Sequence, residues 1–165
     1  MARSNITNEK DLEWTGQSMG NKFKSRRKSL SSPAGGDKLG CSLYEIPPGK
    51  TAWPYHYHLA NEEAIFVLGG RGVLRIDGRE ETISDGDYIC LPAGKMPHQI
   101  INNSDKILRY LCFSTMVEPE VAVYPDSDKV GVFAGSAPGG PKEKRTVHKY
   151  FRGGPDVDYW YGEGG

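Results

Sequence analysis

The sequence predicts an all-β domain, a jelly roll in which two antiparallel sheets face each other and enclose a cavity. Between residues 39 and 134 the chain alternates short apolar or β-branched runs with turn signals rich in Gly, Pro, Asn and Asp, a pattern typical of β-sandwiches and barrels. No stretch of ten or more residues repeats its apolar positions with the 3.6-residue period of an amphipathic helix. The pattern therefore leaves room for eight or more strands and for no long helix.

The expected strands can be justified one after another along the chain. The first, residues 41–46, ends at Pro47 and Pro48, because proline cannot donate a backbone hydrogen bond to a sheet. The pair Asp77–Gly78 predicts a type I′ hairpin turn between two later strands. The full set of expected strands is 41–46, 52–57, 64–68, 73–76, 79–83, 88–91, 98–102, 107–115, 121–124 and 130–133.

Two segments flank this region. Residues 1–38 are polar with a basic cluster, and we expect a solvated arm that lies over the barrel; an anion-binding lid is the alternative. The basic cluster comprises Lys22, Lys24, Arg26, Arg27 and Lys28. Residues 135–165 are first Gly- and Pro-rich and then aromatic. Their aromatic content is too high for a simply disordered tail. We expect this tail to pack on the barrel or on a partner subunit.

The composition excludes several classes of function. The 165 residues suit one domain, and 21 basic against 21 acidic residues argue against general binding to nucleic acid or to anionic membranes. No apolar run approaches the roughly 20 residues that span a bilayer, and the polar N-terminus has no apolar signal core. The three cysteines are widely spaced and odd in number, which favours reduced core residues over disulfides. We therefore expect a cytoplasmic protein that binds neither nucleic acid nor membrane.

Residues 56–63, HYHLANEE, carry the clearest chemical signal. His56 and His58, one residue apart on an extended segment, project from the same face and can share a metal ion. Glu63 follows a turn that can bring its carboxylate back toward the imidazoles, and His98 enters another strand after the turn sequence PAGKMP. Imidazole and carboxylate suit first-row divalent metals. Glu62 remains an alternative to Glu63, because both faces of the following strand are apolar.

These residues resemble the two sequence motifs of the cupin superfamily. The first motif is matched by Gly49, His56, His58, Glu63 and Gly70. The second is matched by Gly86, Pro92, Gly94, His98 and Asn102. Each match contains one more loop residue than the family pattern. The resemblance spans residues 49–102 and implies a double-stranded β-helix, the cupin jelly-roll barrel, over residues 39–134. It further implies a homodimer, because cupins commonly pair through their sheets.

We expect His56, His58, Glu63 and His98 to bind one divalent metal ion, Mn, Fe, Ni or Zn, with coordination positions left open for a small-molecule substrate. Such a centre supports isomerisation of a sugar phosphate, decarboxylation or lyase chemistry on an organic acid, or dioxygenation. Of these reactions we expect a metal-dependent isomerase, with Glu63 as a base. A non-catalytic small-molecule binding or sensor protein is the alternative. Cations that are candidates for a substrate phosphate by position only are Lys50, Arg75, Lys95 and Arg109.

Overall fold

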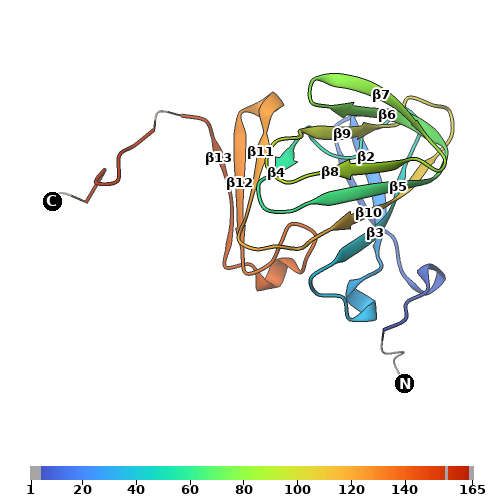
Figure 1. Cartoon of the computed structure of the whole chain (residues 1–165), viewed down its shortest axis with the longest axis horizontal. Coiled ribbons are helices and arrows are strands. Elements are labelled where there is room, and N and C mark those ends of the chain that lie inside the picture. The colour runs from blue at the N-terminus through green and yellow to red at the C-terminus, as the bar shows by residue number, and fades with distance from the viewer. Residues whose placement is uncertain (1–4, 155, 164–165) are drawn as a thin grey trace.

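The structure is a computed structural model that describes residues 5–154 and 156–163 (Figure 1). The regular secondary structure of this part of the chain consists of β-strands and short 3₁₀ turns. The strands are β1 (Thr15–Met19), β2 (Phe23–Ser29), β3 (Gly40–Ile46), β4 (Tyr57–His58), β5 (Glu63–Gly69), β6 (Arg71–Ile76), β7 (Arg79–Ser84), β8 (Tyr88–Leu91), β9 (His98–Ile101), β10 (Leu108–Ser114), β11 (Glu120–Tyr124), β12 (Lys129–Ala134) and β13 (Val147–Arg152). The 3₁₀ turns are η1 (Glu9–Asp11), η2 (Ser32–Ala34), η3 (Pro125–Ser127) and η4 (Lys142–Lys144). None of the described helices is long and apolar enough to cross a membrane.

The strands form a double-stranded β-helix, as predicted. One sheet has the order β1-β2-β3-β10-β5-β8, and two smaller sheets have the orders β13-β12-β11-β4 and β7-β6-β9. An isolated antiparallel bridge between His56 and His98 joins the two smaller sheets. The paired strands are antiparallel throughout. The non-consecutive neighbours, such as β10 between β3 and β5, are what a jelly roll requires.

The core lies between these sheets and follows the period-2 alternation of their strands. On β5, Ile65 and Val67 are buried, whereas Phe66 and Leu68 are exposed on the outer face. Tyr44 on β3 stacks on Tyr110 of β10, with ring centroids 5.3 Å apart. The buried cluster draws on both layers and includes Ile46, Leu74, Ile76, Ile83, Ile89, Leu91, Ile100 and Leu108.

Two glycines are required by the local backbone. Asp77 and Gly78 have φ values of 47° and 77°, the positive values that a type I′ turn needs at both central positions. Gly70 also has a positive φ, of 86°, and a Cβ atom there would collide with the carbonyl oxygen of Ile107. The motif glycine at position 70 is therefore explained by close approach of two backbones.

The N-terminal segment differs from the arm that the sequence suggested. Residues 15–29 form β1 and β2, and β2 pairs in register with β3 and extends the six-stranded sheet. These strands escape a pattern search because the inward positions of β2 include Ser25 and Arg27, so its two faces do not differ in polarity.

At the other end, β13 pairs with β12, but its six residues are all exposed. Residues 156–163 extend away from the barrel (Figure 1). The tail thus contributes one edge strand to the fold, and its packing on a partner subunit stays a prediction.

Candidate metal centre

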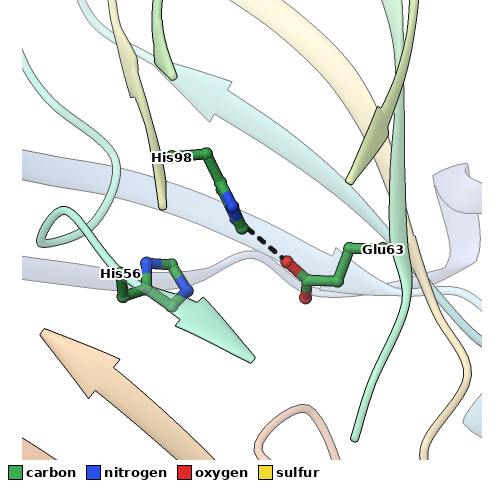
Figure 2. Close-up of side chains that lie close together, drawn as sticks. All are labelled: His56, Glu63 and His98. Atoms are coloured by element: carbon green, nitrogen blue, oxygen red, sulfur yellow. Dashed lines mark ion pairs between the residues drawn. The ribbon is translucent and has the colours of Figure 1, made fainter. Parts of the chain in front are cut away.

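Three of the expected ligands meet inside the barrel. His56 directly precedes β4, Glu63 begins β5 and His98 begins β9, and their side chains point toward one another (Figure 2). One ligand atom from each residue can be chosen so that all three lie within 4.8 Å of one another. His98 Nε2 lies 3.3 Å from Glu63 Oε2.

The backbone explains this convergence. The N–H of His56 donates to the carbonyl of His98 at 3.2 Å, and the N–H of His98 donates to the carbonyl of His56 at 2.8 Å. Residues that exchange both hydrogen bonds in an antiparallel pair project from the same face of the sheet. Glu63 shares its face with Ile65 and Val67, the buried face of β5. Glu62 is exposed on the opposite face, so the structure brings Glu63 and not Glu62 to the histidines.

The outer nitrogens of two rings are held by backbone carbonyls. His56 Nδ1 lies 2.8 Å from the carbonyl oxygen of Pro54, and His98 Nδ1 lies 3.0 Å from that of Met96. A carbonyl can only accept a hydrogen bond, so each Nδ1 carries a proton, and in a neutral ring of this tautomer Nε2 is the nitrogen with the free lone pair. Two oriented Nε2 atoms and a carboxylate are a donor set that fits a first-row divalent metal ion.

His58, the fourth expected ligand, lies beside this group. Its ring is buried, with its centroid 5.0 Å from that of His56. Its Nε2 is 3.7 Å from Glu63 Oε2, and its Nδ1 is 3.5 Å from Glu120 Oε2. The ring thus lies between two carboxylates, and its buried Nδ1 makes no hydrogen bond within the described part of the chain.

Glu120 is a residue of this site that the sequence did not reveal. It begins β11 and is completely buried. Its Oε1 accepts the N–H groups of Leu59 and Ala60 at 3.1 and 3.2 Å, and its Oε2 accepts the N–H of Asn61 at 2.9 Å and its side-chain amide. The carboxylate therefore fixes the turn that follows His58. In the sequence Glu120 looks like any polar residue that precedes a strand, because its partners lie about sixty positions away.

The pKa shifts of Glu63 and His56 favour the protonation states in which these side chains bind metals. Burial raises the pKa of Glu63, but the neighbouring imidazoles, His98 first, lower it further, to about 2. Burial and the nearby His98 and His58 lower the pKa of His56 to about 3. Near neutral pH the carboxylate of Glu63 is therefore ionised and the His56 imidazole is neutral, which are the forms that bind metals.

The pair formed by His58 and Glu120 is shifted in the sense of a mutual attraction. Burial lowers the pKa of His58, but Glu120 and Glu63 raise it more, so the net direction is upward. Burial raises the pKa of Glu120, but His58, Asn61 and the N–H of Ala60 lower it more. The contact between the two side chains is therefore electrostatic as well as steric.

The four cations suggested by position do not gather at this centre. Arg75 forms a bidentate pair with Asp126, at 2.6 and 2.9 Å. Arg109 pairs with Glu9 and, more distantly, with Glu45. Lys50 donates to the carbonyl of Asn21 at 2.6 Å, and Lys95 is exposed. His148, in β13, is also exposed and lies apart from the other histidines, against Phe133.

Comparisons with known proteins agree with this fold. A structure of a proposed sugar phosphate isomerase from Acidithiobacillus ferrooxidans superposes with a TM-score of 0.72 at 26% identity, over 79% of this chain and 86% of that one. A cupin-superfamily sugar phosphate isomerase from Silicibacter pomeroyi has a TM-score of 0.75 at 23% identity, over 89% and 92%. A predicted oxalate decarboxylase from Thermotoga maritima has a TM-score of 0.60 at 22% identity, over 68% and 99%.

Sequence comparisons match part of the chain to a curated protein and to a domain family. A stretch of 59 residues is 37% identical to an uncharacterized protein of Methanocaldococcus jannaschii, which covers 36% of this chain and 46% of that protein. The match spans less than half the length of this curated relative. Residues 42–114 match the cupin domain family. This match identifies residues 42–114 as a cupin domain, in agreement with the double-stranded β-helix fold.

Proposed function

We propose that this protein is a metal-dependent cupin enzyme that acts on a small polar metabolite, and that His56, His58, Glu63 and His98 hold one divalent ion. The observation that carries the proposal is the convergence of His56, Glu63 and His98 with both histidine Nδ1 atoms anchored on carbonyls. Histidines that only pack in the core would not require their free Nε2 atoms to face a carboxylate.

His58 completes the proposed set from the side. Its Nε2 faces the same Glu63 oxygen that His98 approaches, and Glu120 stands behind its Nδ1. A carboxylate in that place fixes the orientation of a ligating ring and raises its basicity. Glu120 is therefore a positioning residue for His58.

When bound, a divalent ion at such a centre polarises a carbonyl or hydroxyl oxygen of the substrate. The chain itself supplies the ligands and excludes bulk water, since His58 and His98 are buried and His56 and Glu63 are partly so. The lowered pKa of Glu63 suits a ligand better than a base, because a general base works best with a pKa near the operating pH.

Among possible substrates we propose a sugar phosphate, with isomerisation as the reaction. This choice is supported by the similarity to the proposed sugar phosphate isomerase from Acidithiobacillus ferrooxidans, at 26% identity over 79% of this chain.

The test combines metal analysis with turnover. We expect purified protein to contain Mn, Fe, Ni or Zn, and to interconvert an aldose phosphate and its ketose phosphate only when the metal is present. Loss of activity on chelation and its return on adding metal would support the proposal. Decarboxylation of a keto acid or oxygen consumption instead of isomerisation would reassign the reaction, and ligand binding without any turnover would indicate a sensor.

A further inference from the structure

The sheet β13-β12-β11-β4 continues from the candidate metal centre to the edge of the barrel (Figure 1). Tyr124, at the end of β11, stacks on the His56 imidazole, with ring centroids 5.7 Å apart and planes inclined by 16°. Because His56 points toward Glu63 and His98 (Figure 2), Tyr124 lies on the face of the sheet that carries the proposed ligands. Residues directly opposite each other on neighbouring strands share a face, so the register of β12 and β13 shows which other side chains flank the centre.

This register places two cations in line with Tyr124. Lys129 in β12 is the partner of Tyr124, and Arg152 in β13 is the partner of Lys129. The ammonium of Lys129 lies 5.1 Å from the ring centre of Tyr124. Two successive contacts, of 5.7 and 5.1 Å, therefore link the His56 ring to the Lys129 ammonium, and Arg152 follows directly beyond it on the same face.

A second tyrosine keeps Lys129 on this inner face. Tyr150 in β13 is the partner of Gly131, and its ring lies across that glycine, since a Cβ atom at position 131 would be 2.9 Å from Tyr150 Cε1. Tyr150 thereby reaches Tyr124, with ring centroids 5.9 Å apart, and its ring centre is 5.9 Å from the Lys129 ammonium. The half-buried lysine thus lies along two aromatic rings beside the centre.

The two cations lack an anionic partner. Like charges directly opposite each other on neighbouring strands destabilise a sheet. In the part of the chain that the structure describes, no carboxylate oxygen lies within 4.0 Å of Lys129 or Arg152. An aromatic face attracts a cation, but it does not replace the oxygen acceptors that ammonium and guanidinium groups bind. An oxyanion bound to both side chains would remove the repulsion and supply these acceptors.

We propose that Lys129 and Arg152 form a subsite that binds the phosphate group of the substrate. Ammonium and guanidinium groups both give charge-assisted hydrogen bonds to phosphate, and the planar arginine can bind it through two N–H groups. Tyr124, which contacts both His56 and Lys129, offers an apolar surface for the carbon chain between the phosphate and the metal centre. The choice of a substrate phosphate rests on the proposed isomerase function, whereas the anion subsite rests on the register and contacts of the two side chains.

Lys149 provides a matched control, because it lies one residue from Tyr150 on the opposite, exposed face of β13. Binding of inorganic phosphate to the full-length, metal-containing protein is measured by NMR titration for the wild type, Lys129→Gln, Arg152→Gln and Lys149→Gln. We expect the dissociation constant to rise about tenfold for the first two variants, because each loses a charge-assisted contact. It should stay within about twofold for Lys149→Gln. Arg152→Lys, which keeps the charge but not the fork, is expected to fall between the wild type and Arg152→Gln.

Turnover separates failure of the subsite from failure of the proposed function. If the protein isomerises a sugar phosphate, Lys129→Gln and Arg152→Gln should raise KM about tenfold and leave the metal content unchanged. Isomerisation with an unchanged KM in both variants would refute the subsite alone. Phosphate binding that depends on Lys129 and Arg152 in a protein without isomerase activity would refute the isomerase and support the anion subsite.

Three outcomes of the titration would overturn the inference. They are the absence of phosphate binding by the wild type, equal weakening by Lys149→Gln and Lys129→Gln, and binding of malonate but not phosphate that depends on Arg152. The last result would assign the two cations to a carboxylate ligand.

Discussion

The histidines of the proposed centre differ in what faces their Nδ1 atoms. Neutral carbonyls hold His56 and His98, whereas the buried carboxylate of Glu120 faces His58. A carboxylate next to the Nδ1 of an imidazole makes that imidazole a stronger metal ligand than a carbonyl in the same place does. His58 Nδ1 makes no hydrogen bond with any described residue but lies 3.5 Å from this carboxylate, and the difference makes His58 and Glu120 the decisive positions to change.

Replacing His58 by alanine removes one proposed ligand and leaves Glu120 without its imidazole partner. We expect His58→Ala to lower metal occupancy at least tenfold, because the loss of a ligand exceeds the roughly 10- to 100-fold effect of changing its support. Elemental analysis of purified protein measures this. His148→Ala, in an exposed histidine of β13, is the control and should keep its metal; unchanged metal content in His58→Ala would refute the assignment.

Glu120→Gln keeps the size of the side chain and removes its charge. We expect metal affinity to fall about 10- to 100-fold, as for other residues that orient a ligating histidine. Competition with a chelator of known affinity gives the number. Glu118→Gln, two residues earlier and exposed, is the matched control. An affinity equal to that of the wild type would show that His58 needs no charged support.

Among the elements, the connection between β9 and β10 depends on one buried side chain. The Asn102 amide donates to the carbonyls of Ile46 and Lys106 at 2.8 and 2.7 Å, and its oxygen accepts from the backbone and hydroxyl of Ser104. It thereby ties β3 to the loop that follows the His98 strand. The second motif ends at this residue because the loop requires an amide with both donor and acceptor.

Asn102→Ala removes these contacts and leaves two carbonyls without their donor. We expect the free energy of unfolding to fall by about 2–4 kcal/mol, measured by denaturant titration. Asn103→Ala, next to it and exposed, should change stability by less than about 0.5 kcal/mol. Equal effects of the two changes would mean that the loop is not held by the buried amide.

Strands that are bounded by residues that end strands or form turns were predictable from the sequence. The strands that begin and end near proline, glycine or an Asp–Gly turn lie within a residue or two of their predicted bounds, as β8 and β12 show. The prediction of a strand over residues 52–57 was wrong. Pro54 interrupts the hydrogen bonding there, and only Tyr57 and His58 form a strand. Pattern alone also left open Glu62 against Glu63, since distinguishing them requires knowing which apolar face of β5 is covered.

At the scale of the whole molecule, exposed aromatic side chains gather at the C-terminal end. Tyr159, Trp160 and Tyr161 are 86%, 72% and 73% exposed, and Tyr150 and Phe151 on the edge strand β13 are about half exposed. Aromatic side chains are enriched in subunit interfaces. We propose that these residues pack against a second copy of the chain and form a homodimer.

Light scattering after size exclusion tests this proposal. We expect the full-length chain to have the mass of a dimer. A chain truncated after Gly154 should dissociate at a higher protein concentration than the full-length chain, because it lacks three aromatic contacts. The truncated chain should bind metal as the full-length protein does, since the proposed ligands all lie before residue 99. A monomeric full-length protein at high concentration would refute the dimer.

The match to the cupin domain ends at residue 114, yet Glu120, whose carboxylate faces the His58 imidazole, follows the matched segment. If the proposed centre is right, two relatives identical over that segment but different at this position would load the same ion with unequal strength. Sorting such proteins by their central segment alone would miss that difference.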